Sequence, residues 1–154
     1  MANNERTVII GMDGSTQAVN AFKWFCKSMK RENDKVVMVY SVEISDAMKS
    51  KQWFQVSTSE ADMKAAIDKN MEIVKGKLNE FAKLMESEHA TGTVRSAQSS
   101  VPGEGIVKTA RELNASMIIM GSRGLGTIRR TILGSVSDYV VHHSHVPVIV
   151  CPPS

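Results

Sequence analysis

The chain has 154 residues, of which 42% are hydrophobic and 23% charged, and its formal net charge is +3. This composition is typical of a globular protein and excludes a disordered chain, and the length predicts a single domain over residues 1–154. The basic residues are dispersed, so we expect no nucleic-acid partner. No apolar run approaches the length of a membrane span, so we expect no membrane partner either.

Cysteine and histidine spacing argues against structural cross-links and metal sites. Cys26 and Cys151 lie far apart and form no CxxC pair, which excludes a disulfide framework and favours a reducing compartment. His142, His143 and His145 straddle an expected helix-to-strand junction, and adjacent helical residues do not share a face. We therefore expect a cytoplasmic protein with no metal site, and no motif of catalytic residues is present.

Five short runs predict strands, at 7–10, 36–40, 93–98, 117–120 and 146–150. Four of them are continuously apolar, which is typical of a parallel sheet covered on both faces. The run at 93–98 is polar and suits an edge position. The run at 146–150 is strongly apolar but contains Pro147, which also favours an edge.

Helical spacing of apolar residues alternates with these runs. Helices are expected around Phe22, around Ile106 with a start near Pro102, and around Val140. The longest apolar stripe runs from Met63 to Met85, and a capping box over 57–60 predicts that its helix starts near residue 58. Residues 43–56 show no period and are interpreted as a surface excursion. The alternation predicts an α/β fold, namely a doubly wound, Rossmann-like three-layer sandwich with a five-stranded parallel sheet.

A glycine and serine pattern follows the strand at 117–120. It reads Gly121-Ser122-Arg123-Gly124, then nine residues, then Gly134-Ser135-Val136-Ser137. Glycine-rich backbone beside a helix N-terminus is suited to phosphate. The alternative is an ordinary strand-to-helix connection whose glycines only make tight turns. The chain carries neither a P-loop nor a complete G-x-G-x-x-G, so the pattern predicts a different phosphate site.

Three strand ends converge at the carboxyl edge of such a sheet, where ligands bind. Asp13 follows the first strand and either caps the next helix or binds a ribose hydroxyl or Mg²⁺. Val42 follows the second strand and offers its backbone to a base edge. Arg123 is the favoured phosphate ligand, whereas Arg129 and Arg130 are as readily explained as solvated surface residues.

The pattern from Gly121 to Ser135, with Asp13 and the ending Val146-Pro147-Val148-Ile149-Val150, resembles the universal stress protein family, and its ATP-binding branch in particular. The resemblance implies a five-stranded α/β domain that forms a homodimer through its last strand, Val146 to Val150. It also implies residues around the phosphates and ribose, namely Gly121, Arg123, Gly124, Gly134, Ser135, Val136 and Ser137. The residues that the resemblance implies around the nucleoside are Gly11, Asp13, Val42 and Met120.

The resulting hypothesis is a homodimeric stress-response protein that binds ATP, with or without Mg²⁺, and whose loop from Ser122 to Thr131 becomes ordered with the nucleotide. Two alternatives stay open. One is a slow ATPase that produces ADP, although no residue is assigned to orient water. The other is a dimerisation module that binds no nucleotide.

Overall fold

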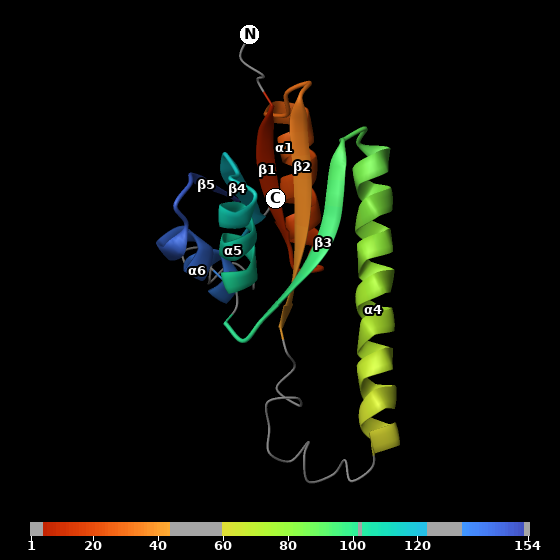
Figure 1. Ribbon diagram of the computed structural model, residues 1–154. Coiled ribbons are helices and arrows are strands. Elements are labelled where there is room, and N and C mark those ends of the chain that lie inside the picture. Colours follow the sequence, from red (N-terminus) through yellow and green to blue (C-terminus); the bar gives the residue numbers. More distant parts are fainter. Residues whose placement is uncertain (1–4, 44–59, 102, 123–133, 153–154) are drawn as a thin grey trace.

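The computed structural model describes residues 5–43, 60–101, 103–122 and 134–152 (Figure 1). Strands and helices alternate along the chain, as the sequence predicts. The elements in order are β1 (Arg6–Met12), α1 (Thr16–Ser28), β2 (Asp34–Glu43), α4 (Glu60–Ser87), β3 (Gly92–Ser99), α5 (Glu104–Glu112), β4 (Met117–Gly121), α6 (Ser135–His143) and β5 (Val148–Cys151). The predicted helix start near 58, Pro102 and the interval 44–59 lie outside the described residues.

The strands form one five-stranded sheet with the order β3-β2-β1-β4-β5. Every neighbouring pair is parallel. The predicted α/β class and five-stranded parallel sheet are thereby confirmed. The chain builds the sheet outward from β1 to β2 and β3, and then returns to the other side of β1 for β4 and β5, so the winding direction reverses between β1 and β4.

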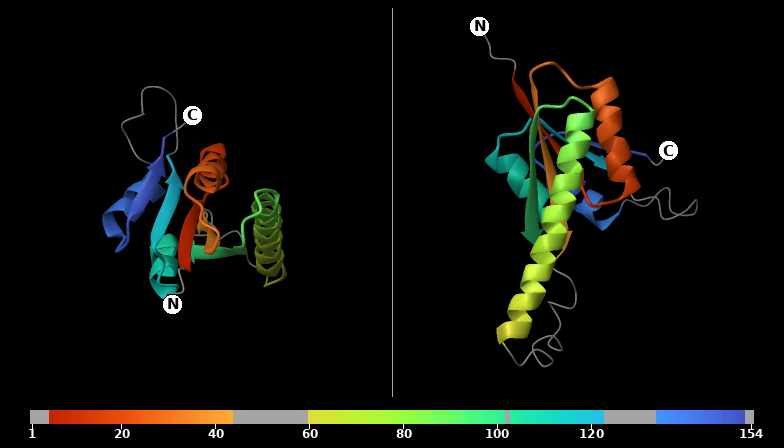
Figure 2. Two further views of the ribbon diagram at one scale, coloured as in Figure 1. Left: turned by 90° about the horizontal axis from the view of Figure 1, so that it is seen from above. Right: turned by 90° about the vertical axis from the view of Figure 1, so that its right-hand side faces the viewer.

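Two hydrophobic clusters cover the two faces of the sheet. On one face, Phe22 and Phe25 of α1 and Phe81 of α4 pack with side chains such as Ile10. On the other face, side chains of α5 and α6 pack with alternate residues of the same strands, among them Ile106, Val136, Val140, Ile9 and Ile118. Figure 2 (left) shows α1 on one side of the sheet and α5 and α6 on the other. The result is the expected three-layer sandwich.

The apolar stripe of helix α4 is buried at its end and exposed nearer its middle. Phe81 and Met85 near its end are buried, but Met71 is 52% exposed. Figures 1 and 2 show the reason, since α4 continues past the end of the sheet and only its last turns lie against β3. Helical periodicity therefore predicts the helix, but it does not show which part of the stripe the sheet covers.

The two edge strands agree with the sequence in position but differ in extent. β3 lies at one edge and pairs with β2 over its whole length, from Val36↔Gly92 to Glu43↔Ser99. β5 lies at the other edge and begins at Val148 rather than at Val146. The Pro147 carbonyl accepts a hydrogen bond from the Ile118 N–H, at 2.9 Å, but proline has no N–H to donate in return.

An ion pair ties the start of β1 to the start of β2, at the end of the sheet opposite the glycine pattern. Arg6 Nε donates to Asp34 Oδ1 at 2.6 Å, and its Nη2 donates to Oδ2 at 2.9 Å. Burial alone would raise the pKa of Asp34, but the hydrogen bonds from Arg6 and from the Arg31 N–H, with the charges of both arginines, lower it below its ordinary value.

Candidate functional site

The carboxyl ends of β1 and β4 separate where the winding of the sheet reverses. Their paired residues end at Ile10↔Ile119. Beyond that point β1 continues to pair with β2 as far as Met12↔Tyr40, and β4 continues to pair with β5 as far as Gly121↔Cys151. The two central strands therefore leave a crevice between them, which is the place where open α/β sheets bind ligands.

Two glycines at these strand ends allow close packing around the crevice. A Cβ atom built on Gly121 would lie 2.4 Å from the Gln17 carbonyl oxygen, in the first turn of α1. A Cβ atom on Gly11 would lie 3.1 Å from Met120 Cε and 3.2 Å from Ile106 Cδ1. The first contact is with backbone and cannot yield, whereas the second is with the ends of flexible side chains.

Asp13 lies in the turn between β1 and α1, at the mouth of the crevice. Its Oδ1 accepts hydrogen bonds from the Ser15 N–H, at 2.9 Å, and from the Ser15 hydroxyl. Ser15 Oγ in turn accepts from the Ala18 N–H at 3.2 Å and caps α1. The interpretation of Asp13 as the helix cap is therefore wrong, because Ser15 occupies that position and Asp13 supports it.

The N-terminus of α6 faces the same crevice. Its N-cap residue is Gly134, which has no side chain to bond the first N–H groups of the helix. The Ser137 hydroxyl donates to the Gly121 carbonyl at 3.1 Å and joins the first turn of α6 to the end of β4. An uncapped helix N-terminus of this kind carries donors and a positive partial charge suited to an anion.

Ser122, the residue after β4, has an unsatisfied hydroxyl. Its N–H donates to the Cys151 carbonyl at 2.9 Å, so the backbone extends the β4–β5 pairing by one residue. Its Oγ is buried and has no hydrogen-bond partner within the described part of the chain. Leaving a buried hydroxyl unpaired costs about 1–3 kcal/mol, and the same hydroxyl would be satisfied by a polar ligand group.

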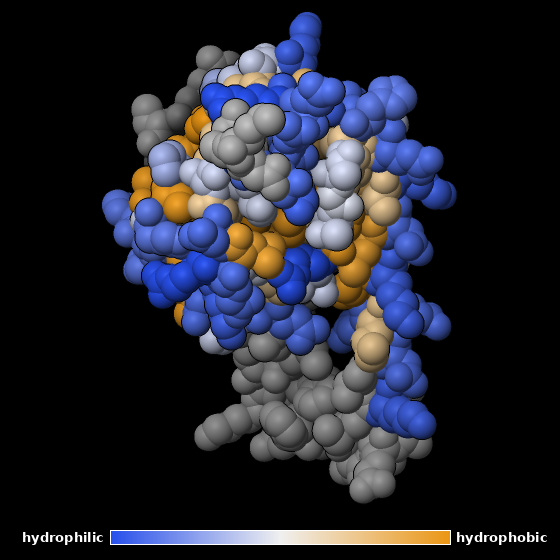
Figure 3. Space-filling view, turned by 45° about the horizontal axis from the view of Figure 1, so that its top comes forward, coloured by the Kyte–Doolittle hydropathy of each residue, from blue (hydrophilic) through white to orange (hydrophobic). Residues whose placement is uncertain are grey.

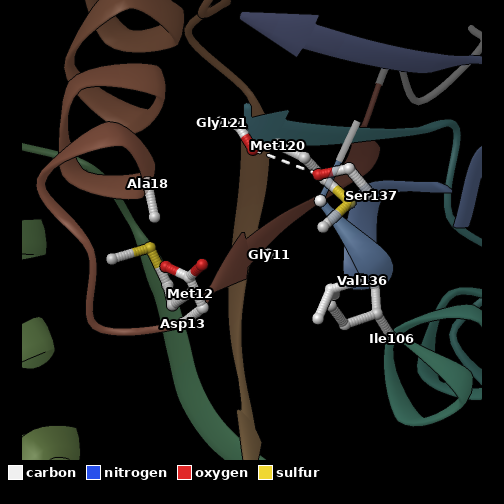
Figure 4. A pocket seen from close by; sticks show the side chains of 10 residues that line it. Gly11, Met12, Asp13, Ala18, Ile106, Met120, Gly121, Val136 and Ser137 are labelled. Carbon is white, nitrogen blue, oxygen red and sulfur yellow. Dashed lines mark hydrogen bonds between the residues drawn. The ribbon is translucent and has the colours of Figure 1, made fainter. Parts of the chain in front are cut away.

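A small cavity lies at the bottom of the crevice (Figure 4). Its volume is about 10 Å³, room for about one water molecule. Residues from β1, α1, α5, β4 and α6 meet around it. The lining is made of Gly11, Met12, Asp13, Ala18, Ile106, Met120, Gly121, Gly134, Val136 and Ser137.

The structure brings together many of the residues that sequence and resemblance single out. The cavity is lined by Gly11, Asp13, Met120, Gly121, Gly134, Val136 and Ser137. Ser135 is the first residue of α6 and is exposed. Val42 lies near the end of β2, where its backbone pairs with Gln98 of β3. Arg123 and Gly124 lie outside the described residues.

Three of the described lining residues are not among the predicted site residues. Met12 follows Gly11, Ala18 is the first buried residue of α1, and Ile106 lies in α5. In the sequence, each of the three has the pattern of an ordinary apolar core residue. Only the approach of α1 and α5 to the same strand ends places them at the cavity.

A larger hollow of about 410 Å³ lies between α4 and the edge strand β3. Figure 3 shows apolar surface beside α4 among mostly hydrophilic side chains. The hollow is open, and none of the predicted site residues is among its described lining. Its lining consists of Leu78, Asn79, Ala82, Met85, Glu86, Ala90, Gly92 and Val94.

Neither cysteine provides an activated nucleophile. Burial raises the pKa of the Cys26 thiol to about 11, and burial also raises the pKa of Cys151. Both thiols therefore stay protonated at neutral pH, and it is the thiolate that reacts. Within the described ranges, no three His, Cys, Asp or Glu side chains come close enough together to hold a metal ion.

Comparisons with known proteins agree with this geometry. A model of the universal stress protein family matches residues 5–152. A universal stress protein of Methanocaldococcus jannaschii is 26% identical over 151 residues, which cover 96% of this chain and 82% of that protein. Universal stress proteins of Mycobacterium bovis and Mycobacterium tuberculosis are longer, and the match to this chain covers 47% of their length.

Solved structures share the fold. A universal stress protein in complex with cAMP has a TM-score of 0.66 at 21% identity, covering 97% of this chain and 98% of that one. A universal stress protein family protein of Arabidopsis thaliana with AMP bound has a TM-score of 0.66 at 19% identity, covering 97% and 92%. Because the family model matches residues 5–152, which is almost the whole chain, the chain belongs to the universal stress protein family.

Proposed function

We propose that this protein binds ATP in the crevice between β1 and β4 and acts as a homodimeric stress-response module. The observation that carries the proposal is the cavity where these two strands separate, next to the uncapped N-terminus of α6. Relatives of the same fold have been crystallised with cAMP and with AMP, which supports an adenine nucleotide as the ligand class.

The described residues suit a nucleotide in two ways. The first N–H groups of α6 and the buried hydroxyl of Ser122 offer donors to phosphate oxygens. The Asp13 carboxylate lines the cavity from the opposite side and is proposed to accept hydrogen bonds from ribose hydroxyls. The anionic end of the ligand is therefore proposed to lie at α6 and the sugar near β1.

The other proposed contacts rest on the sequence pattern. Arg123 and Gly124 are proposed to complete the phosphate site, Ser135 to add a hydroxyl, and the backbone of Val42 to bind the base. Mg²⁺ is proposed only as a companion of the triphosphate. The loop from Ser122 to Thr131 is proposed to become ordered when ATP binds, which requires ATP to prefer one of its states.

The homodimer is proposed to form through β5. This strand is an edge strand whose four residues are all half-buried in the single chain. Ile149 and Val148 pack into the two clusters, on opposite faces of the sheet. An apolar edge with unpaired backbone groups is suited to pairing with a second copy about a twofold axis.

The cytoplasm is the proposed location. Among the described residues, no helix has both the length and the apolar character needed to cross a membrane.

The test compares the protein with two glycine variants. Gly11→Ala puts a methyl group into the cavity against Met120 and Ile106, whereas Gly76→Ala places one in open space on α4. Protein purified without added nucleotide is denatured and the released small molecules are identified by mass spectrometry, and ATP, AMP and cAMP are titrated by calorimetry. We expect the wild type and Gly76→Ala to bind ATP, and Gly11→Ala to bind it at least tenfold more weakly.

The alternatives predict other results. If the wild type releases no nucleotide on denaturation and binds none in the titrations, the proposal is contradicted and the dimerisation module is favoured. If the wild type converts ATP to ADP and the Gly11→Ala variant does not, the slow ATPase is established. Equal affinity in the two glycine variants would place the nucleotide elsewhere on the protein.

A further inference from the structure

Ser15 links the Asp13 carboxylate to the start of α1. Its N–H donates to Asp13 Oδ1 at 2.9 Å, and its hydroxyl donates to the same oxygen. Its Oγ accepts from the Ala18 N–H at 3.2 Å. These directions are fixed, because a backbone N–H can only donate and a carboxylate can only accept. A chain of hydrogen bonds therefore runs from the first turn of α1 through the Ser15 hydroxyl to Asp13.

Gly14, between these two residues, gives the turn its conformation. Its φ of 82° lies in the left-handed region, which glycine adopts without steric cost. An aspartate side chain in such a turn accepts a hydrogen bond from the backbone two residues later, and here that residue is Ser15. The backbone of the turn therefore holds Ser15 against Asp13.

The carboxylate that Ser15 holds lines the cavity. Asp13 lies on the side opposite Val136 and Ser137 of α6 (Figure 4). It is only half-buried, so packing alone restricts its rotamers less than in the core, and the two bonds from Ser15 supply a further restriction. Because a carboxylate accepts several hydrogen bonds at once, Asp13 can keep both bonds from Ser15 while it accepts another from a ligand.

We infer that Ser15 is a positioning residue that fixes the Asp13 carboxylate at the cavity, and that this pair makes the site prefer nucleotides whose sugar carries hydroxyl groups. The inference rests on the proposed function, in which Asp13 accepts hydrogen bonds from ribose hydroxyls. A carboxylate that is already held in place loses little conformational freedom when the sugar binds, so more of the hydrogen-bond energy contributes to affinity. Ser15 acts through Asp13 and not by contact with the ligand.

Ser15 also caps α1, and this second role must be separated from the first. Loss of the cap would affect every nucleotide alike, because it changes the stability of the helix and not the recognition of the sugar. Loss of positioning would affect only nucleotides with ribose hydroxyls. The probe that separates the two roles is 2′,3′-dideoxy-ATP, which keeps the base and the triphosphate of ATP but lacks both hydroxyls.

The experiment is calorimetric titration of the full chain with ATP and with dideoxy-ATP, at a temperature at which circular dichroism shows every variant to be folded. Ser15→Ala removes the hydroxyl, Ser15→Gly removes it but keeps a residue that is common at helix N-caps, and Ser15→Thr retains it. Asp13→Ala is measured alone and combined with Ser15→Ala. Ser87→Ala is the control, since it removes a serine hydroxyl that donates to the Leu84 carbonyl, at 2.7 Å, at the end of α4.

We expect the wild type, Ser15→Thr and Ser87→Ala to bind ATP about tenfold more tightly than dideoxy-ATP, because hydrogen bonds to a charged group are the stronger ones. Ser15→Ala and Ser15→Gly should bind ATP about three- to tenfold more weakly than the wild type and dideoxy-ATP equally well. Ser15→Ala should cause no further loss in the Asp13→Ala background, since it acts through that carboxylate.

Three results would overturn the inference and leave the proposed ATP site intact. Equal losses for both nucleotides in Ser15→Ala would show that Ser15 serves only as the helix cap. No loss for either would show that Ser15 has no part in binding. A wild type that binds ATP and dideoxy-ATP equally would show that Asp13 does not recognise the sugar. If the wild type binds neither nucleotide, the proposed function itself is refuted, and the inference with it.

Discussion

Ile10 pairs with Ile119, and no later residue of β1 pairs with β4 in the described chain. Both side chains are fully buried, so the sheet is tightly packed up to this pair. Beyond it, β1 follows β2 and β4 follows β5. The position of the cavity is therefore a consequence of strand pairing, and the glycines that surround it serve a geometry that the sheet already imposes.

Gly121 is expected to tolerate no side chain. In Gly121→Ala the methyl group would lie 2.4 Å from the Gln17 carbonyl oxygen and 2.9 Å from the Ala18 backbone nitrogen. Relief requires a shift of α1 relative to β4, with an expected loss of about 3 kcal/mol in the free energy of unfolding. Urea denaturation measures this loss, with Gly76→Ala as the control. A loss smaller than about 1 kcal/mol would show that the packing of α1 on β4 is looser than described.

Ser122→Ala is expected to raise stability and weaken ATP binding together. The variant removes a buried hydroxyl that has no partner in the described chain, which should increase the free energy of unfolding by about 1 kcal/mol. The melting temperature should then rise by about 2–4 °C. ATP affinity should fall about fivefold, because one phosphate donor is lost.

Both effects of Ser122→Ala are needed. Calorimetry with ATP and with adenosine locates the contact, since adenosine carries no phosphate and should bind the variant and the wild type equally. A variant that is destabilised, or one that loses affinity for adenosine as well, would contradict the assignment of Ser122 to the phosphate.

Asp34 is expected to make the protein sensitive to acid. Its pKa in the folded protein lies below the ordinary value of 3.8, so its contribution is fully present above about pH 4. That contribution is lost as the pH falls through the folded-state pKa. Asp34→Asn leaves Arg6 without its charged partner and should cost about 3 kcal/mol at pH 7. The difference between variant and wild type should shrink below pH 4.

Urea unfolding at pH 7 and between pH 4 and pH 2 measures this difference. Glu5→Gln is the control, because the Glu5–Lys35 pair is exposed, with 3.2 Å between Lys35 Nζ and Glu5 Oε2. A stability difference between Asp34→Asn and the wild type that stays constant over this range would show that Asp34 does not titrate in the window expected.

Val150→Lys is expected to separate the proposed dimer into monomers. Val150 is half-buried in the edge strand, and a lysine there places charge against the partner strand. Sedimentation velocity measures the change, and Val141→Lys, at an exposed apolar position on α6, is the control. A wild type that is monomeric at high concentration, or a Val150→Lys variant that stays dimeric, would exclude β5 as the interface.

The sequence predicts most of the fold because parallel strands buried on both faces read as continuous apolar runs. The run that became β1 and the run that became β4 were both recognised in this way. The polar composition of β3 also predicted its edge position. The exposure of Met71 could not be read from the sequence, since periodicity describes one face of a helix but not where the sheet beneath it ends.

The candidate site was predicted where one chain segment carries the signal. Gly121 and Ser137 belong to one motif, and Asp13 follows a strand end. The approach of Ile106 to Gly11 depends on how α5 packs, and no local pattern encodes it. Likewise, only the folded chain shows that the Ser137 hydroxyl donates a hydrogen bond to Gly121, whereas the buried Ser122 hydroxyl has no partner among the described residues.

The most direct test of the central claim is an NMR titration of the isotope-labelled protein with ATP, which follows the backbone amides. We predict saturable shifts at the amides of Gly11, Gly121 and Gly134, which lie on three different elements around the cavity, and little change at Gly92 beside the hollow under α4. Saturable shifts near Gly92 with none at the three glycines, or no shifts at all, would contradict the account.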